Sequence, residues 1–279
     1  MLKVLKAGFY TTVQDSGRFH YRNKGVPVSG VMDEISVYKV NTLLENDVAS
    51  AVLEITMTGP KLVFEKETYI VLGGAIMSAK LNDLPIQNYK IYQIKSGDIL
   101  SFGGLKKGFR IYLGVKGGFT PTDILGSKSF YKPVTKANRL VDNDVVPYVY
   151  NNLFQPKISE IKVDSFLEKS VLEVTKGPEF ELLNDRQLEE IFSRTFTVAH
   201  ENNRMAYQLS ETIAPHEISM LTSATIPGTV QFTPAGKLIV LMKDGQTTGG
   251  YPRVVQLSDR SICILAQKKS GDTISFKLV

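Results

Sequence analysis

Three short segments of this 279-residue chain concentrate side chains that bind anions and hydrogen-bonding ligands. The N-terminal motif is QDSGRFHYR at residues 14–22, and the serine motif, VSGVMD, follows at residues 28–33. The C-terminal motif is DGQTTGGYPR at residues 244–253. Glycines permit close approaches that a Cβ forbids, and the arginines, hydroxyls and amides supply donors and acceptors. This mixture predicts a concave polar ligand site.

The N-terminal motif offers acidic, basic and aromatic candidates. Asp15 and Arg18 stand three residues apart. They either pair to pin a tight turn or face a ligand together, because a guanidinium binds a carboxylate or phosphate through two parallel hydrogen bonds. Arg22, next to Tyr21, is the better candidate for a free anion-binding group. His20 is a weaker candidate for an acid or base near neutral pH.

The serine motif leads into a predicted helix from about Asp33 to Glu45, with Val37, Val40 and Leu44 on one apolar face. Asp33 is the predicted N-cap of this helix. Backbone N–H groups at a helix start favour an anionic group. Because Asp33 is assigned to the cap, Ser29 is the residue of this motif that is more available for a ligand.

The C-terminal motif can present consecutive hydroxyls and backbone donors to one small polar ligand. The alternative is a glycine-rich hairpin whose threonines bind their own backbone. Arg204 and Tyr207 either line the same cleft or hold the two lobes together. The candidate catalytic residues are Asp15, Arg18, Arg22 and Ser29. The candidate substrate-binding residues are Tyr21, Arg204, Tyr207, Gln246, Thr247, Thr248, Gly249, Gly250, Tyr251 and Arg253. We predict that Arg18 or Arg22 and residues 246–250 line one cleft between two lobes.

Short β-branched and aromatic runs, separated by glycine, proline, asparagine and aspartate, predict a mainly β fold. A second, shorter helix is predicted after Asp185. Two stretches are echoed later in the chain: LEITMTGP at residues 53–60 by LEVTKGP at 172–178, and KSGDILSF at 95–102 by KSGDTISF at 269–276. These echoes predict two related β lobes. We place the lobes at residues 1–155 and 156–279, and the N-terminal motif is free to cross over and complete the second lobe.

Composition restricts the function classes. The chain is 43% hydrophobic and 22% charged, with a formal net charge of +5, as expected of a globular protein. Basic residues alternate with acidic ones and form no recognised nucleic-acid module. No apolar run approaches the roughly 18 residues that cross a bilayer, which predicts a cytoplasmic protein without a membrane segment. The single cysteine, Cys263, lies in an apolar run and is predicted to be buried.

Residues 11–15, 203–207, 228–231 and 249–252 carry a family resemblance. The chain resembles the allophanate hydrolase subunit 2-like, or biotin-dependent carboxyltransferase-like, family. This family includes the C subunit of bacterial 5-oxoprolinase and the antagonist of the Kip kinase inhibitor. The resemblance implies a mainly β fold of two cyclophilin-like β-barrel lobes packed together, with a few short helices.

The resemblance also implies an activity. It indicates a subunit of a multi-subunit, ATP-dependent 5-oxoprolinase, a hydrolase that opens the cyclic amide of 5-oxoproline to L-glutamate. The expected partners are a Kip-inhibitor-like, or allophanate hydrolase subunit 1-like, subunit and a third subunit, and the chain alone is expected to be inactive. One alternative is carboxyl transfer from carboxybiotin to urea or another amide. Another is a non-enzymatic regulator that binds a kinase-inhibitor protein.

Several expected motifs of cofactor enzymes are missing from the sequence. There is no G-x-x-x-x-G-K-[ST] loop, so an ATP site is expected on, or shared with, a partner subunit. No cysteine–histidine cluster has zinc spacing, and no metal site is predicted. No Met-Lys-Met element is present, so no covalently attached biotin is expected on this chain.

Overall fold

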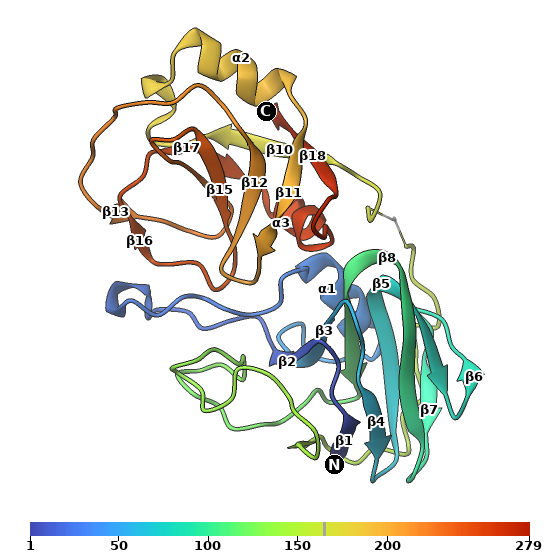
Figure 1. Ribbon diagram of the computed structural model, residues 1–279. Helices are drawn as coiled ribbons and strands as arrows, with labels where there is room; N and C mark the ends of the chain where they lie inside the picture. Colours follow the sequence, from blue (N-terminus) through green and yellow to red (C-terminus); the bar gives the residue numbers. More distant parts are fainter. Residues whose placement is uncertain (164–165) are drawn as a thin grey trace. The chain divides into compact units, whose positions relative to one another are not determined.

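The computed structural model describes residues 1–163 and 166–279 and divides into two units (Figure 1). Unit 1 comprises residues 1–18, 29–163 and 166–167, and unit 2 comprises residues 19–28 and 168–279. The chain therefore changes unit later than the position predicted after residue 155. Residues beyond 155 stay with unit 1 because Lys157 N donates to Glu45 Oε1 (2.5 Å) and Ile161 packs on a core cluster of that unit. Part of the N-terminal motif crosses to unit 2.

Unit 1 is built on a curled antiparallel sheet, nine-stranded as counted over the described residues. Its strands are β1 (Leu2–Lys6), β2 (Tyr10–Gln14), β3 (Val52–Thr56), β4 (Lys61–Phe64), β5 (Thr68–Leu81), β6 (Leu84–Pro85), β7 (Tyr92–Ile94), β8 (Ile99–Val115) and β9 (Val145–Val146). The order β2-β3-β8-β4-β1-β9 is open, and β5 pairs with β6, β7 and β8.

Side chains alternate between the two faces of a sheet along each strand. In this sheet, apolar residues are buried on both faces. One face carries the larger apolar core, to which Leu53 and Ile55 of β3 contribute. Helix α1 (Glu34–Leu43) packs on the other face, near Val52. A Cβ at Gly73 or Gly114 would lie 2.5 or 2.4 Å from a Val40 methyl. The two glycines therefore let the helix approach the sheet.

Unit 2 contains a closed barrel with the order β10-β17-β14-β15-β12-β11-β18. The strands of unit 2 are β10 (Val171–Lys176), β11 (Phe196–Asn202), β12 (Ala206–Thr212), β13 (Ser223–Ala224), β14 (Thr229–Phe232), β15 (Lys237–Leu241), β16 (Thr248–Gly249), β17 (Arg253–Leu257) and β18 (Thr273–Leu278). Strands β13 and β16 form a separate antiparallel pair beside the barrel (Figure 1). The prediction of a mainly β fold with few short helices is confirmed, with one closed barrel and one curled, open sheet.

The echoed Ser-Gly-Asp turns adopt the same hydrogen-bonded structure in both units. In unit 1, Asp98 accepts from Lys95 N (2.7 Å) and its carbonyl accepts from Phe64 N (3.0 Å). In unit 2, Asp272 accepts from Lys269 N (2.9 Å) and its carbonyl accepts from Val198 N (2.9 Å). The sequence echo therefore corresponds to a structural one.

The remaining regular elements are short. The predicted N-cap is confirmed, because the Asp33 carboxylate accepts from Ser36 N (3.0 Å) at the start of α1. Helix α2 (Asp185–Ser193) is present as predicted, and 3-10 turns η1 (Arg22–Lys24) and η2 (Phe180–Leu182) occur in unit 2. Helix α3 (Asp259–Ala266) was not predicted. Over the described residues, none of the helices has the length and apolar character needed to span a membrane.

Candidate functional site

Two arginines of the predicted set bind successive carbonyl groups beside strand β13. Arg253 Nη1 donates to the Ala224 carbonyl (2.6 Å), and Arg22 Nη2 donates to the Thr225 carbonyl. Both arginines belong to unit 2, although they are far apart in the sequence. The fold therefore places two guanidinium groups at the carbonyls of two successive residues, at the end of β13 and just after it.

Arg22 reaches this position at the start of the short η1 turn. Gly25 caps the turn in a left-handed conformation (φ 78°), and its N–H donates to the Arg22 carbonyl (3.0 Å). The side chain is half-buried, and this burial lowers the pKa of Arg22. A guanidinium nevertheless stays protonated in a protein. Among the described residues Arg22 has no carboxylate partner, so its charge is available to an anion.

Arg253 is held by a carboxylate that the sequence did not reveal. Glu179 accepts from Arg253 Nε (2.8 Å), from Arg253 Nη2 (2.6 Å) and from the Arg253 backbone N–H (2.9 Å). The side-chain hydrogen bonds from Arg253 lower the pKa of Glu179, and those to Glu179 raise the pKa of Arg253. Glu179 therefore offsets the charge of Arg253 and fixes its direction.

Thr225 connects Arg22 to the C-terminal motif. Its hydroxyl donates to the Gln246 carbonyl (2.5 Å), and its backbone N–H donates to the Thr247 carbonyl (3.0 Å). Because Arg22 donates to the carbonyl of the same residue, Thr225 links Arg22 to Gln246 and Thr247. These contacts lie within unit 2, and the predicted cleft between two lobes stays a prediction.

The C-terminal motif bends around a buried amide. Gln246 Nε2 donates to Gln231 Oε1 (3.3 Å), and a Cβ at Gly249 would lie 2.3 Å from Gln231 Nε2. A side chain at Gly249 would therefore have to displace the Gln231 amide, whereas a Cβ at Gly250 would meet nothing closer than 3.9 Å. Gln246 and Thr248 are exposed and Thr247 is half-buried. The backbone carbonyls of Gln246 and Thr247, rather than their side chains, bind Thr225.

Arg204 and Tyr207 serve the barrel itself. Arg204 is 5% exposed and forms a two-bonded ion pair with Asp244, at 2.8 and 3.2 Å. Tyr207 is fully buried in β12, and its hydroxyl donates to the Lys268 carbonyl (3.2 Å). Both were candidates for substrate contact or for holding the two lobes together, and these contacts lie within unit 2. Tyr251, by contrast, is 42% exposed.

The other predicted catalytic residues lie in unit 1. Asp15 accepts from the hydroxyls of Ser127 (2.7 Å) and Ser129 (2.6 Å) and from Lys128 N (2.6 Å). Arg18 is fully buried and donates to the Ile124 and Ser129 carbonyls, at 3.0 and 2.8 Å. Both side chains therefore fasten residues 124–129 to the N-terminal motif, and their contact with a ligand stays a prediction.

Ser29 and Gly30 pack on the turn at residues 16–17. A Cβ at Gly30 would lie 2.9 Å from Gly17 N and from the Ser16 carbonyl oxygen. Ser29 is fully buried in a left-handed conformation (φ 57°), and its hydroxyl has no hydrogen-bond partner among the described residues. The serine motif and the N-terminal motif thus form one packed feature in unit 1.

A buried polar cluster behind this feature was missed. Glu54 Oε2 accepts from Met32 N (2.8 Å) and from the Tyr112 hydroxyl (3.0 Å), and that hydroxyl accepts from Asp33 N (2.9 Å). Arg110 lies 3.7 Å from Glu54. Burial, followed by the charge of Glu54, raises the pKa of Tyr112 well above its usual value. The sequence feature that could have indicated this cluster was Glu54, a glutamate within an otherwise apolar strand sequence.

Comparison with known proteins decides the family. Residues 24–278 match the family described as carboxyltransferase domain, subdomain A and B. The chain belongs to this family. It is 32% identical to the C subunit of 5-oxoprolinase from Escherichia coli, over 99% of this chain and 90% of that protein. It is 29% identical to urea amidolyase of Saccharomyces cerevisiae, over 99% of this chain and 16% of that protein.

Solved structures of other proteins share the fold. The crystal structure of TTHA0988 is similar with a TM-score of 0.91 and 27% identity, over 99% of this chain and 55% of that one. The Kluyveromyces lactis urea carboxylase is similar with a TM-score of 0.88 and 28% identity, over the whole of this chain and 27% of that one. The chain thus corresponds to about half of TTHA0988 and about a quarter of the urea carboxylase. The family resemblance seen in the sequence is confirmed.

Proposed function

We propose that this chain is one of the subunits of a multi-subunit 5-oxoprolinase, in the position of the C subunit, and contributes to opening the lactam of 5-oxoproline to L-glutamate with ATP hydrolysis. The observation that carries the proposal is the match to the Escherichia coli C subunit, which extends over 99% of this chain and 90% of that protein. A second C subunit, from Haemophilus influenzae, matches over 100% and 91%.

The arginine cluster of unit 2 gives the proposal a chemical basis. The substrate carries a carboxylate, and Arg22 is a half-buried cation without a carboxylate partner among the described residues. A guanidinium binds a carboxylate or phosphate through charge-assisted hydrogen bonds. Thr248 and Gln246 are exposed polar residues of the C-terminal motif, whose backbone binds Thr225, the residue to which Arg22 donates. In this proposal Arg22 holds the substrate anion and these two groups orient it.

Arg253 has a different role in the same cluster. Because Glu179 occupies two of its nitrogens and its remaining Nη1 binds Ala224, Arg253 fixes β13 to the barrel wall. Arg253 then positions β13, and with it the neighbouring Thr225 carbonyl to which Arg22 donates. ATP enters the proposal as a co-substrate whose binding site lies on, or is shared with, a partner subunit.

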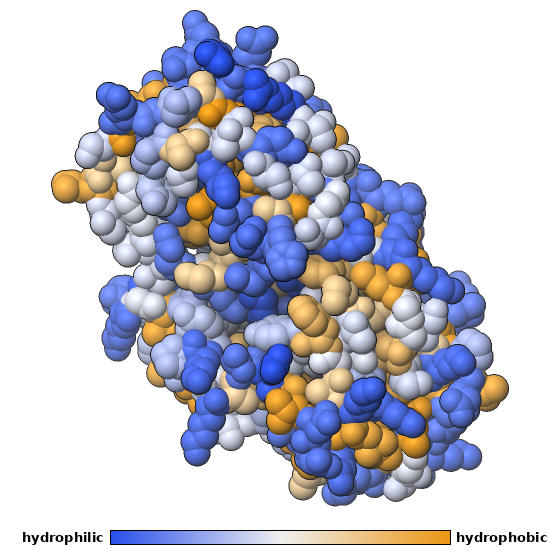
Figure 2. Space-filling view, viewed as in Figure 1, coloured by the Kyte–Doolittle hydropathy of each residue, from blue (hydrophilic) through white to orange (hydrophobic). Residues whose placement is uncertain are grey.

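The partners in this proposal are a Kip-inhibitor-like subunit and a third subunit. Unit 2 exposes apolar side chains that a partner can cover, including Leu221 (89%) and Met205 (47%). Figure 2 shows exposed apolar residues among hydrophilic ones on the face that it presents. Such contacts would account for activity that appears only in the assembled complex.

The decisive experiment is reconstitution. The chain is combined with both partner subunits, and 5-oxoproline-dependent release of phosphate from ATP is measured together with glutamate formation. We expect turnover with the full set and none when this chain is omitted. Unchanged turnover without this chain would disprove the proposal.

A second candidate is carboxyl transfer to urea or another amide, since the chain also matches urea amidolyases and a urea carboxylase. The same guanidinium would then hold a carboxylate-like group. Urea-dependent consumption of carboxybiotin, supplied on a biotinylated partner, would select this candidate over the first.

A further inference from the structure

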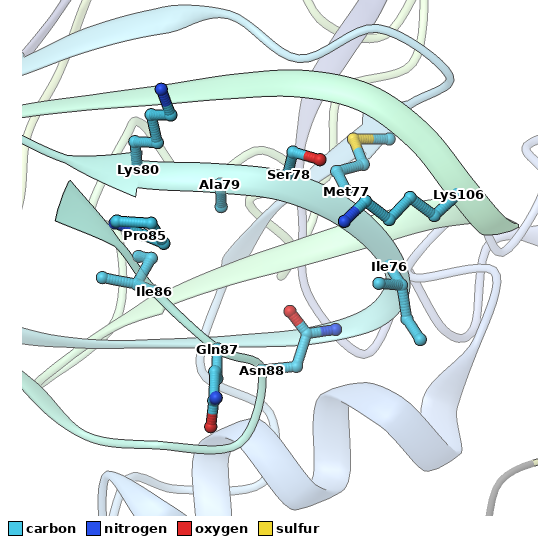
Figure 3. Close-up of a pocket in the computed structure, with 10 residues that line it drawn as sticks. All are labelled: Ile76, Met77, Ser78, Ala79, Lys80, Pro85, Ile86, Gln87, Asn88 and Lys106. Atoms are coloured by element: carbon cyan, nitrogen blue, oxygen red, sulfur yellow. The ribbon is translucent and has the colours of Figure 1, made fainter. Parts of the chain in front are cut away.

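A pocket in unit 1, remote in sequence from the proposed catalytic cluster, has the size of a small-molecule site. Its volume is about 480 Å³, within the range of about 300–1,000 Å³ typical of ligand pockets. Residues 76–80 of β5 form one side, residues 85–88 after β6 form another, and Lys106 of β8 completes it (Figure 3).

The pocket exists because pairing along β5 is interrupted. Strand β7 pairs with residues 68–70 of β5, and β6 pairs with residues 80–81, which leaves a gap between them. The register between β5 and β8 also shifts three times between Gly74 and Ala79. Asn88 fixes the wall across the gap, because its amide donates to the Gly74 (3.2 Å) and Ala75 (3.0 Å) carbonyls. The opening is therefore built into the sheet.

The lining combines an apolar surface with positive charge. Ile76, Met77, Pro85 and Ile86 supply apolar contacts, and no lining residue is acidic. Figure 3 shows Lys106 extending from β8 toward Met77 and Ser78.

Lys106 and Ser78 both have polar groups available for a ligand. Lys106 is exposed and has no carboxylate partner among the described residues. Ser78 is half-buried, and a Cβ added at Gly103 would lie 2.9 Å from the Cβ of Ser78. Gly103 thus lets β8 approach β5 closely where the ammonium and the hydroxyl meet the pocket.

We propose that this pocket binds a small carboxylate with a hydrocarbon body. The carboxylate lies at the Lys106 ammonium and the Ser78 hydroxyl, because a cation and a hydroxyl donor together match a singly charged anion. The hydrocarbon lies against Ile76, Met77 and Ile86, where burial removes its apolar surface from water. This site is separate from the one proposed for 5-oxoproline and does not depend on it.

The test uses octanoate as the probe and the complete chain labelled with ¹³C at its methionine methyl groups. The Met77 methyl signal, assigned with a Met77→Leu variant, is followed during titration. We expect a saturable shift with octanoate and weaker binding of octan-1-ol, which lacks the charge. Acetate, which lacks the hydrocarbon chain, should cause no shift.

Charge variants complete the test. Lys106→Gln should weaken octanoate binding about fivefold, the effect of one unit charge about 4 Å away in water, while Lys106→Arg should retain it. Lys90→Gln, an exposed lysine outside the lining, is the matched control and should bind like the unaltered chain. The proposal is overturned if Met77 shows no saturable shift, if octanol binds as tightly as octanoate, or if Lys106→Gln and Lys90→Gln behave alike.

Discussion

Replacing Arg22 with alanine tests the proposed site most directly. The change removes the half-buried guanidinium and its hydrogen bond to the Thr225 carbonyl. A hydrogen bond from a charged donor contributes about 1–2 kcal/mol when partly exposed. Loss of a donor that stabilises charge in a transition state costs about 3–4 kcal/mol, or roughly 100- to 1,000-fold in rate. The expected loss of activity therefore exceeds the loss of stability.

The assay measures both quantities on the same preparations. Turnover of the reconstituted complex is compared with the urea-unfolding free energy of the isolated chain for Arg22→Ala, Arg22→Lys and Arg186→Ala. Arg186 is a matched control, because it is a largely exposed arginine of unit 2 whose ion pair is with Glu190. Arg22→Lys keeps the charge but loses the planar fork, so intermediate activity is expected.

Two results would refute the reasoning about Arg22. One is normal turnover per folded molecule in Arg22→Ala, accompanied by a large fall in unfolding free energy. The other is an equal loss of activity in Arg22→Ala and Arg186→Ala. Either result would make Arg22 a structural clamp on β13 rather than a ligand-binding group.

Further substitutions test the supporting contacts. The pKa of Glu179 is lowered in the folded chain, so its contribution to stability is present above its unfolded pKa near 4.5 and is lost as the pH falls below that value. Glu179→Gln should therefore reduce the difference in unfolding free energy between pH 7 and acidic pH, as measured by urea unfolding. Gly249→Ala should lower the unfolding free energy by about 1–3 kcal/mol, since its Cβ would press on Gln231. Glu54→Ala should cost about 3–5 kcal/mol, because it leaves Arg110 and buried donors without this carboxylate.

Matched controls make these substitutions interpretable. Gly250→Ala adds a methyl where the nearest atom is 3.9 Å away, so its effect should stay within about 0.5 kcal/mol. Glu173→Ala changes the exposed counterpart of Glu54 in the echoed strand and should be similarly mild. Equal effects within either pair, Gly249 with Gly250 or Glu54 with Glu173, would show that the packing arguments are wrong.

Local sequence signals were sufficient for the regular elements with clear patterns. Asp33 before a stripe of apolar residues predicted the start of α1, because an N-cap carboxylate satisfies a backbone N–H locally. The echoed stretches predicted two related β lobes, and their Ser-Gly-Asp turns form the same local hydrogen bonds in both units. Helix α3 was missed because most of its residues, including Cys263, are buried, and an apolar run of that length does not distinguish a buried strand from a buried helix.

The site itself was decided by tertiary structure. The sequence supplied the residue types: arginines, threonines and glycines in compact motifs. It ranked Arg22 above Arg18 as a free anion-binding group, but it did not show that the Arg18 guanidinium fastens a loop in unit 1 or that Arg22 joins unit 2 beside the C-terminal motif. It also gave no sign that Glu179 would neutralise Arg253. These outcomes depend on contacts between residues far apart in the chain, and the spacing of residues in a sequence carries no information about which carbonyl or carboxylate the folded chain brings to each guanidinium.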